Sequence, residues 1–302
     1  MKKRQIGSSD LFVSEVGLGC MSVGTEEAHA IRLIEEAIDH GVNYLDTADL
    51  YDQGLNEEFV GKVIKNKRDS IILATKVGNR FEKGKTGWSW DPSKKYIMNA
   101  VKESLQRLQT DYIDLYQLHG GTAQDNIDET IDAFEQLKKE GYIRYYGISS
   151  IRPNVIREYV TRSSIVSVMM QYSILDRRPE EVFPLLKEHN ISVVARGPVA
   201  KGLLTERPLE STMVEKGYLG YDGSELANVI STLKEIAGIR SLTELALQYC
   251  LHESTVAAVV AGASKSEQLL ENIRATQSSP LTESEILQIK ETTKTSVYEL
   301  HR

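Results

Sequence analysis

Short apolar runs alternate along this chain with longer segments whose apolar residues recur at helical spacing. The runs have the length of buried strands and predict strands at residues 16–20, 43–46, 71–76, 112–118, 143–148, 165–171, 191–195 and 255–260. The longer segments predict helices at residues 26–40, 93–108, 128–139, 153–160, 179–188, 241–251 and 266–275, with another from Asn56 and a last one after Pro280. Eight strand–helix pairs in strict alternation favour a parallel sheet with helices outside it.

Residues at the ends of the predicted helices give local start and stop signals. Gly41 follows helix 26–40 at the position where a left-handed residue commonly ends a helix. Asn56 is expected to be an N-cap residue, because acidic residues fill the turn that follows it. Two later helices open with capping boxes, which pair Ser241 with Glu244 and Thr282 with Glu285.

The order of elements distinguishes two α/β architectures. Residues 4–6 and 11–13 flank a Gly-Ser-Ser-Asp turn, which predicts a β-hairpin ahead of the alternation. An open doubly wound sheet would carry a glycine-rich turn after its first strand. Gly17 and Gly19 instead lie within a strand without a third glycine, and they are interpreted as small residues that let a ligand approach the backbone. We therefore expect an α/β fold: one (β/α)8 TIM barrel over residues 1–302, with an N-terminal β-hairpin and an extra C-terminal helix.

Two loops at one end of the expected barrel carry little pattern. They span residues 79–92 and 205–240, the second within a weakly patterned stretch from 197 to 240. Tyr218 and Tyr221 lie in this stretch. It could fold over a bound ligand as a lid, or lack order without one.

Charge and composition narrow the class of partner. Lys+Arg 36 against Asp+Glu 43 gives a net charge of −7, which argues against nucleic acid or an anionic membrane as a partner. No run approaches the ~20 apolar residues of a membrane span, and the basic N-terminus has no apolar segment behind it. A cytoplasmic protein is expected, with Cys20 and Cys250 as free thiols. The sequence assigns no oligomeric state.

Polar residues capable of acid–base chemistry end or follow several of the apolar runs. Asp46, Lys76, His119 and Gln171 are such residues, and Tyr51 comes shortly after Asp46. The carboxyl ends of barrel strands meet at one rim, where barrel enzymes place their active sites. An ammonium group beside a phenol lowers the phenol's pKa from its ordinary value near 10. The set predicts Tyr51 as a general acid tuned by Lys76, with Asp46 holding Lys76 and His119 orienting a carbonyl oxygen.

Three of these strand ends resemble the signatures of the aldo-keto reductases, most closely those of their bacterial branch. The segments are Asp46-Thr-Ala-Asp-Leu-Tyr51, Ala74-Thr-Lys-Val-Gly78 and Asp111-Tyr-Ile-Asp-Leu-Tyr-Gln-Leu-His119, and the similarity extends over nearly the whole chain. The resemblance implies NADP(H) bound in an extended pose on a barrel without a Rossmann fold. It also implies direct hydride transfer from the nicotinamide to a small carbonyl substrate. No metal is expected, since the histidines show no close ligand spacing.

The same resemblance assigns cofactor contacts to the expected rim. Ser149 and Gln171 match residues that hydrogen-bond the nicotinamide carboxamide. Arg196 stands where relatives commonly place an aromatic residue that stacks on the nicotinamide, and its guanidinium plane could stack there or bind a phosphate or the substrate. Residues 198–204 resemble the pyrophosphate loop. The full expected set is Gly19, Cys20, Met21, Ser149, Gln171, Arg196, Pro198, Gly202, Gly262, Ser264, Lys265, Gln268 and Asn272.

The segment from Gly262 to Asn272 bears on the choice between NADP(H) and NAD(H). It leads into a helix N-terminus, where backbone N–H groups and the helix dipole favour anions. Ser264 and Lys265 would supply a hydroxyl and a cation for the 2′-phosphate, which favours NADP(H). Gln268 replaces an arginine that other family members carry, so NAD(H) stays open as the less favoured cofactor.

The substrate is the least readable partner. Trp88 and Trp90, in the loop 79–92, are candidates for the apolar wall of a substrate pocket, although either could simply anchor the loop. The main rival function is a non-catalytic NADP(H)-binding barrel that acts as a redox sensor or as a subunit. A metal-dependent hydrolase or isomerase and a purely structural barrel are more remote. The intact set Asp46, Tyr51, Lys76 and His119 favours the reductase.

Overall fold

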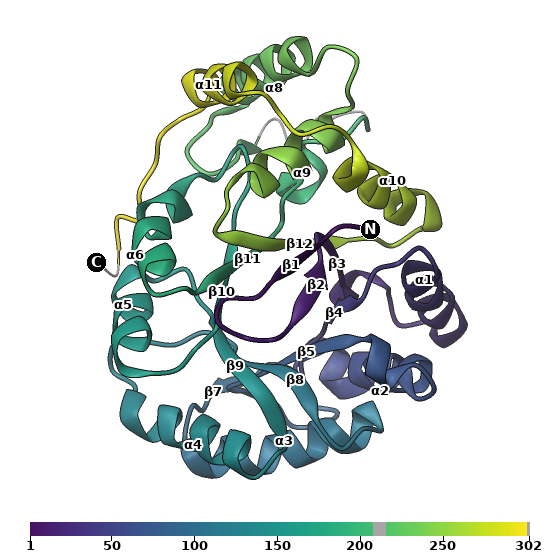
Figure 1. Ribbon diagram of the computed structural model, residues 1–302, viewed down its shortest axis with the longest axis vertical. Coiled ribbons are helices and arrows are strands. Elements are labelled where there is room, and N and C mark those ends of the chain that lie inside the picture. Colours follow the sequence, from purple (N-terminus) through teal and green to yellow (C-terminus); the bar gives the residue numbers. More distant parts are fainter. Residues whose placement is uncertain (208–215, 301–302) are drawn as a thin grey trace.

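Eight parallel strands close into a barrel in the computed structural model, which describes residues 1–207 and 216–300 (Figure 1). Each barrel strand pairs with the next one along the chain, and the last, β12, pairs with the first, β3, to close the ring. This confirms the predicted (β/α)8 barrel. The strands are β3 (Val16–Gly19), β4 (Tyr44–Asp46), β5 (Ile72–Val77), β8 (Ile113–Leu118), β9 (Ile143–Ser149), β10 (Ser167–Gln171), β11 (Ser192–Arg196) and β12 (Val256–Gly262).

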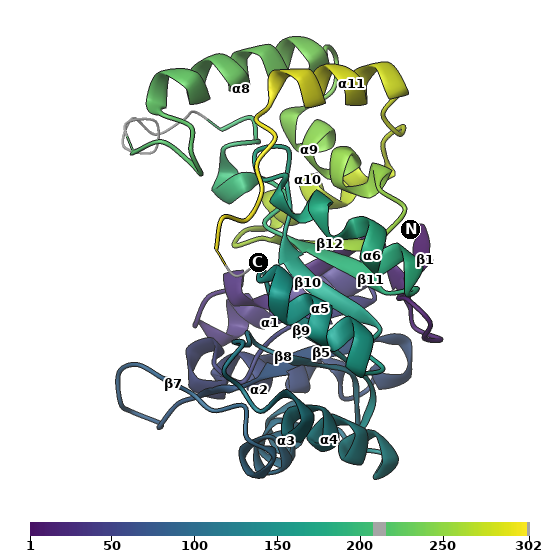
Figure 2. The same cartoon turned by 90° about the vertical axis from the view of Figure 1, so that its left-hand side faces the viewer.

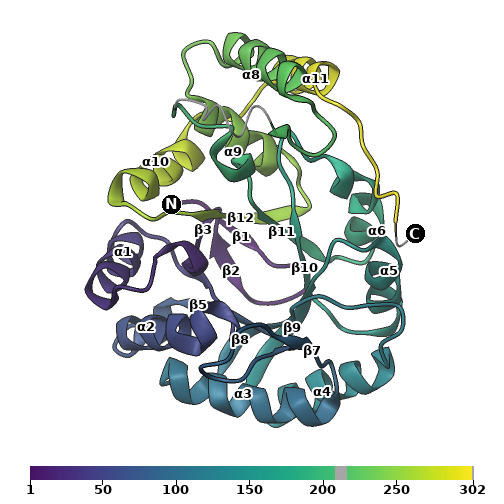
Figure 3. The same ribbon diagram turned by 180° about the vertical axis from the view of Figure 1, so that it is seen from behind.

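Helices surround the barrel, and most of them bury one apolar face against it. In α1, for example, Ala30, Leu33, Ile34 and Ala37 are buried at helical spacing. Figures 2 and 3 show α8 and α11 side by side, outside the helices next to the strands. The helices are α1 (Glu27–Asp39), α2 (Leu55–Ile64), α3 (Lys94–Leu108), α4 (Ile127–Lys139), α5 (Pro153–Arg162), α6 (Phe183–Glu188), α8 (Gly223–Ala237), α9 (Leu242–His252), α10 (Ser266–Gln277) and α11 (Glu283–Thr292). Across the described part of the chain, no helix has the length and apolarity needed to cross a membrane.

Several local predictions are confirmed. Strands β1 (Lys3–Gln5) and β2 (Phe12–Ser14) form the expected hairpin, and α11 is the expected extra C-terminal helix. Gly41 has a φ of 90°, as a left-handed helix end requires. Both expected capping boxes are present, at Ser241 with Glu244 and at Thr282 with Glu285.

The β1–β2 hairpin closes one end of the barrel (Figure 1). Ile6, Leu11 and Val13 are completely buried and belong to the same apolar cluster as Val166 and Tyr44, near the starts of barrel strands. Removing three such side chains from water stabilises the fold by roughly 1.5–3 kcal/mol each. The hairpin thus acts as a plug at the amino ends of the strands, opposite the rim that carries the polar strand ends.

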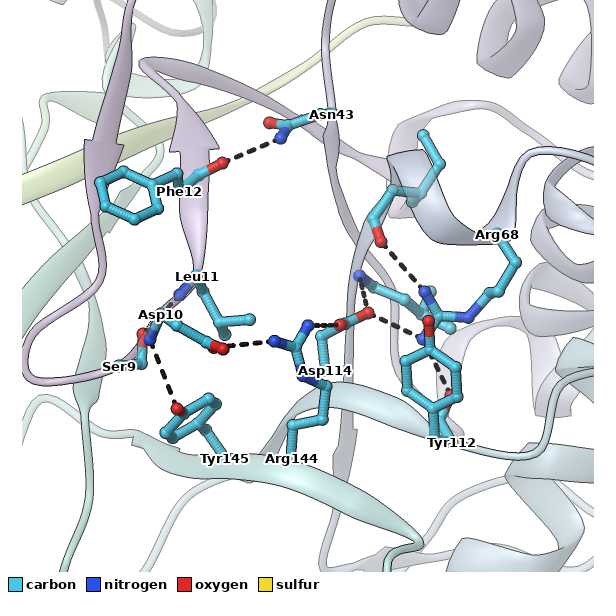
Figure 4. Close-up of polar contacts among 12 residues, drawn as sticks. Ser9, Asp10, Leu11, Phe12, Asn43, Arg68, Tyr112, Asp114, Arg144 and Tyr145 are labelled. Atoms are coloured by element: carbon cyan, nitrogen blue, oxygen red, sulfur yellow. Dashed lines mark hydrogen bonds and ion pairs between the residues drawn. The ribbon is translucent and has the colours of Figure 1, made fainter.

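A chain of ion pairs joins the plug to the barrel wall (Figure 4). The buried Asp114, at the start of β8, accepts from Arg144 at 2.6 Å and lies 2.7 Å from the Arg68 guanidinium. Arg144 also donates to Asp10, in the hairpin turn, at 2.7 Å. The Asp114 carboxylate additionally accepts from the Leu73 backbone N–H, which ties β8 to β5. The floor of the barrel is therefore held by charge pairs as well as by apolar packing.

Two predicted boundaries are wrong, each for a physical reason. The helix expected at 179–188 is split into a 3₁₀ turn (Arg178–Glu181) and α6, because Pro184 has no backbone N–H to continue a helix from the preceding turn. Asn56 is not an N-cap: α2 begins at Leu55 after Gly54. The Asn56 side chain instead accepts from the Thr47 hydroxyl at 2.6 Å and donates to the backbone carbonyl of Cys20, directly after β3.

The weakly patterned loops also contain regular structure. Loop 79–92 carries a small hairpin of β6 (Asn79–Arg80) and β7 (Ser89–Trp90), which projects from the barrel on the side away from β1 (Figure 2). The stretch 205–240 contains α8, whose Asp222 and Glu225 form a capping box. Residues 208–215 of that predicted lid lie outside the described residues.

Candidate active site

The carboxyl ends of β4, β5 and β8 gather the predicted catalytic side chains. Asp46 ends β4, Lys76 is the next to last residue of β5, and His119 follows β8 directly. Parallel pairing in register places Asp46 opposite Ala74 and Lys76 opposite Gln117, so these side chains share one end of the barrel. The expected convergence of the four residues is thereby present in the fold.

Lys76 is the centre of this group. Its side chain is 1% exposed, and its ammonium group has three acceptors: Asp46 at 2.7 Å, the Thr47 carbonyl at 2.8 Å and the Tyr51 hydroxyl at 3.3 Å. An ammonium group has three N–H donors, so Lys76 is fully satisfied by these contacts. Asp46 and Tyr51 raise the pKa of Lys76 by more than burial lowers it, which keeps the lysine charged. The Tyr51 oxygen accepts from Lys76 and leaves its own proton free to point elsewhere.

A left-handed turn sets the position of Tyr51. Tyr51 begins a 3₁₀ turn that runs to Gly54, and Asp52, Gln53 and Gly54 all have positive φ values, of 49°, 54° and 90°. Non-glycine residues with positive φ are uncommon, and such backbone occurs preferentially at functional sites. α2 begins at Leu55, directly after this turn, so the turn connects Tyr51 to a helix and holds the tyrosine ring at the rim next to Lys76.

The pKa of Tyr51 differs from the predicted direction. Burial raises the pKa of the phenol, and the opposing effect of Lys76 offsets this only in part, so that the net shift is upward. The prediction considered the neighbouring ammonium group alone and omitted the cost of placing a phenolate in a buried site. Tyr51 is therefore protonated at neutral pH, as a proton donor must be, and Lys76 limits how weak an acid it becomes.

His119 is held in its neutral form. Burial, with the nearby charges of Lys76 and Arg196, lowers the pKa of His119 to about 3. The His119 and Tyr51 rings meet edge to face with centroids 5.9 Å apart. The buried Nδ1 atom of His119 has no hydrogen-bond partner. A neutral imidazole at this place offers one N–H donor for a carbonyl oxygen without competing for the proton of Tyr51.

Buried polar residues behind the strands hold the catalytic segments. Glu57 is completely buried and accepts from the Thr75 hydroxyl at 2.6 Å and from Arg107 at 2.7 Å. Thr75 precedes Lys76, so this contact fixes the end of β5. Thr47, whose carbonyl accepts from Lys76, is likewise fixed by its bond to Asn56. Sequence reasoning missed both contacts, because nothing local distinguishes a buried glutamate in a helix from an exposed one.

A cavity of about 420 Å³ lies beside Tyr51 and contains most of the predicted cofactor residues. Lys201, Thr205, Arg207 and Tyr218 line it as well. None of the four is in the predicted set of contacts, although Lys201 lies in the predicted pyrophosphate loop and Tyr218 in the predicted lid. Their position in the loop after β11 is the signal that could have identified them. The predicted residues that line this cavity are Gly19, Met21, Gln171, Arg196, Pro198, Gly202, Gly262, Gln268 and Asn272.

Four predicted cofactor residues do not line this cavity. Cys20 is buried, with its thiol directed at a backbone carbonyl, and burial raises its pKa. Ser149 lines a neighbouring cavity. Ser264 and Lys265 are exposed at the start of α10, where Ser264 bonds to Gln268.

The glycines of the first and last strands have different roles. A Cβ atom on Gly262 would lie 2.2 Å from the Ser22 hydroxyl, so a side chain at this position would displace Ser22 where the two segments meet beside the cavity. A Cβ on Gly17 would lie 2.5 Å from the Tyr44 ring. Gly17 therefore makes room for a core side chain, and the interpretation that it lets a ligand approach is wrong for this residue. Gly19 does line the cavity.

A second cavity, of about 330 Å³, adjoins the first at Arg196, which lines both. His119, Trp88 and Trp90 line it. The Trp90 ring packs over Gly78 and its Nε1 donates to Asp125 at 2.9 Å, which anchors the loop. Trp88 is 58% exposed and forms an outer wall. Both tryptophans thus lie where a substrate would reach His119.

A larger cleft, of about 850 Å³, lies elsewhere. Residues of α2 and α3 line it, and none of Tyr51, Lys76 and His119 does. The two smaller cavities are the candidate site, since Tyr51 lines one of them and His119 lines the other. Both cysteines are free and buried. Within residues 1–207 and 216–300, no group of His, Cys, Asp or Glu side chains is arranged to hold a metal ion.

Comparisons with known proteins agree with this geometry. A family model described as the Aldo/keto reductase family matches residues 15–294. The chain is 63% identical, over the full length of both proteins, to the uncharacterized oxidoreductase YqkF of Bacillus subtilis (strain 168). It is 32% identical to L-galactose dehydrogenase of Arabidopsis thaliana, over 90% of this chain and 87% of that protein.

Solved structures give the same result. The chain matches the holo form of aldo-keto reductase AKR11C1 from Bacillus halodurans at 64% identity with a TM-score of 0.97, covering 100% of this chain and 99% of that one. The TM-score to the apo form is 0.88, at 59% identity and with the same coverage. The chain therefore belongs to the aldo/keto reductase family and is an oxidoreductase.

Proposed function

We propose that the protein reduces aldehydes and ketones to alcohols with NADP(H), and that Tyr51 is the general acid. The observation that supports this most directly is the set of contacts at Lys76, which bonds to Asp46 at 2.7 Å and to the Tyr51 hydroxyl at 3.3 Å. A phenol held against an ammonium group at the mouth of a cavity is a proton donor with a fixed direction. The substrate class is a small carbonyl compound that enters past Trp88.

The two adjoining cavities fit a nicotinamide cofactor and a carbonyl substrate. Gly262 allows β12 to meet Ser22 at a distance that a side chain would exclude, and Lys201 and Arg207 supply cations for phosphates. Gln171, which lines the same cavity as Tyr51, presents an amide for the nicotinamide carboxamide. When bound, the cofactor would supply a hydride to the carbonyl carbon. The TM-score of 0.97 to a holo structure of a relative supports a cofactor-binding conformation.

The chain's own residues would then manage the carbonyl oxygen. Neutral His119 hydrogen-bonds that oxygen and orients it toward Tyr51. Tyr51 donates its proton as negative charge develops on the oxygen, and Lys76 stabilises the phenolate that remains. Asp46 keeps the ammonium group in place throughout. Trp88 and Trp90 exclude water from one side of this exchange.

A Tyr51→Phe variant tests the assignment. The ring and its packing are retained, so binding of NADPH, followed by fluorescence titration, is expected to stay within about twofold of the parent protein. Reduction of a panel of aldehydes and ketones, followed at 340 nm, is expected to fall by at least ~10²-fold, the lower range for a general acid. Near-normal turnover in the variant would refute the role of Tyr51. A parent protein that binds NADPH without any turnover would favour the sensor.

A further inference from the structure

We infer that Asp176 is a positioning residue, which determines the atom of the Gln171 amide that faces the nicotinamide end of the cofactor cavity. The inference rests on the proposed function, in which Gln171 binds the nicotinamide carboxamide. Asp176 does not line the cavity itself, and its contact with the cavity is through the Gln171 side chain.

A tight turn after β10 brings the two side chains together. Ser173 and Asp176 exchange two backbone hydrogen bonds, of 3.2 and 3.0 Å, so the chain folds back on itself directly after Gln171. This turn places the Asp176 carboxylate 3.0 Å from Nε2 of Gln171. The position of the carboxylate is therefore set by the backbone and not by a flexible loop.

Arg178 fixes the carboxylate itself. Its Nε donates to one oxygen of Asp176 at 2.7 Å and a terminal nitrogen donates to the other at 2.8 Å, which is the two-point pairing that arginine forms with carboxylates. The Arg178 guanidinium in turn lies 4.9 Å from the centre of the Tyr298 ring, in the C-terminal segment. Asp176 is 1% exposed, so water does not compete for its oxygens.

The chemistry of these groups allows only one orientation of Gln171. A carboxylate paired with arginine is an acceptor only, so it selects the NH₂ side of the amide. The second N–H of Gln171 donates to the Tyr218 hydroxyl at 3.1 Å. Both amide donors are then used, and Oε1 remains as an acceptor directed to Arg196 and the cavity. Gln171 is thus set to accept a hydrogen bond from the N–H₂ group of a nicotinamide carboxamide.

Tyr218 contacts the same amide but cannot select its orientation. A phenol hydroxyl donates or accepts equally well, and it would satisfy either face of Gln171. Substitutions of Asp176 and Tyr218 therefore form a matched pair. Each removes one hydrogen bond to Gln171, but only the substitution of Asp176 removes the group that fixes the orientation of the amide.

The test compares binding of NADP⁺ with binding of its 3-acetylpyridine analogue, in which a methyl group replaces the carboxamide NH₂. The parent protein is expected to bind NADP⁺ more tightly by roughly fivefold, the effect of one net hydrogen bond. In Asp176→Asn one carboxylate oxygen is replaced by an NH₂ group, so the acceptor-only partner that enforces the orientation of Gln171 is lost, and only the long 3.4 Å contact from Arg196 to Oε1 still favours it. The affinity ratio is expected to fall toward one. Tyr218→Phe is expected to keep the ratio of the parent even if both affinities weaken.

Two further variants separate this role from a general loss of stability. Asp114→Asn alters a carboxylate that is equally buried and also paired with arginine, at the opposite end of the barrel, and is expected to leave the ratio unchanged. Asp176→Glu retains an acceptor-only group and is expected to preserve most of the ratio. If Asp176→Asn yields no folded protein by circular dichroism, Asp176→Ser removes the carboxylate with a smaller side chain.

The outcomes are distinct. A parent-like affinity ratio in folded Asp176→Asn or Asp176→Ser would overturn the inference. A fall of the ratio in Tyr218→Phe as large as that in Asp176→Asn would overturn it as well. The measurement uses binding alone and does not require turnover. A parent protein that binds NADP⁺ but reduces no carbonyl compound would refute the proposed function while the ratio still tests Asp176.

Discussion

At the scale of single residues, the site depends on one lysine whose three donors are all committed. Lys76 reaches Asp46, a backbone carbonyl and Tyr51, so a change in any acceptor disturbs the other two. Burial alone would make Tyr51 too weak an acid, and the charge of Lys76 opposes that effect. The residues are therefore coupled in a way that none of them shows separately.

Lys76→Met tests this coupling, because it retains most of the length of the unbranched side chain and removes the charge. Without the ammonium group, burial loses its main opposing effect and the pKa of Tyr51 is expected to rise further above its ordinary value. Carbonyl reduction needs a protonated Tyr51, and its loss on the alkaline side would then begin at higher pH than in the parent. The rate at neutral pH is expected to fall by at least ~10²-fold. If activity were lost on the alkaline side at the same pH in both proteins, Lys76 would not lower the pKa of Tyr51.

His119 affects stability as well as chemistry. Its pKa is lowered to about 3 in the folded chain, against about 6.5 when unfolded. Between these values the unfolded state binds the proton, so folding stability falls as pH falls, by roughly 3 kcal/mol at pH 4 from this residue. His119→Gln is expected to lose correspondingly less stability between pH 7 and pH 4 in urea unfolding. The exposed His189→Gln provides the control, and equal pH dependence in all three proteins would contradict the assignment.

At the scale of elements, strand ends were predictable and buried polar contacts were not. Asp46, Lys76 and His119 were identified because each ends or follows an apolar run, and the fold then brings their positions together. Asn56 was misread because an N-cap is inferred from neighbours in sequence, whereas its partner, Thr47, lies on another element.

The helices missed or misjudged show the same limit. Helix α8 was overlooked although Asp222 and Glu225 form a capping box, because its surroundings were read as a loop. The break before α6 was overlooked although Pro184 signals it. In both cases a local signal was present and was outweighed by the apparent pattern of the longer segment. The upward shift in the pKa of Tyr51 had no such local signal, because the burial that causes it depends on the whole fold.

The N-terminus of α10 is the element that would select between cofactors. Lys265 is its N-cap residue and is exposed, so it is free to contact a 2′-phosphate. Lys265→Ala is expected to weaken the binding of NADPH by about 1.5–3 kcal/mol, the contribution of a charge-assisted hydrogen bond, and to leave the binding of NADH nearly unchanged. Fluorescence titration with both cofactors measures the difference. Lys102→Ala, an exposed lysine on α3, is the matched control, and equal weakening of both cofactors would exclude the 2′-phosphate role.

At the scale of the whole molecule, the barrel separates its chemistry from its closure. The carboxyl ends of the strands hold the site, and the amino ends hold the hairpin plug with its ion pairs (Figure 4). The resemblance of the barrel and its rim to a known family could be read from the chain, because both follow from repeated local patterns. The ion pairs of the floor could not, since Asp10, Arg68, Asp114 and Arg144 come from four separate segments.

This separation makes the floor a test of stability without chemistry. Asp114 is 1% exposed and neutralises both Arg68 and Arg144, so Asp114→Asn leaves two cations short of a partner. The cost is expected to be about 3 kcal/mol in urea unfolding, near the lower range for breaking a buried pair. Asp10→Asn breaks only the outer contact of Arg144, where the aspartate is 67% exposed, and is expected to cost less than ~1 kcal/mol.

Because both residues lie opposite the rim, kcat/KM of the folded variants should equal that of the parent. Equal costs for the two substitutions would mean that Arg144 is neutralised by solvent rather than by Asp114, and a changed kcat/KM would mean that the two ends of the barrel are coupled.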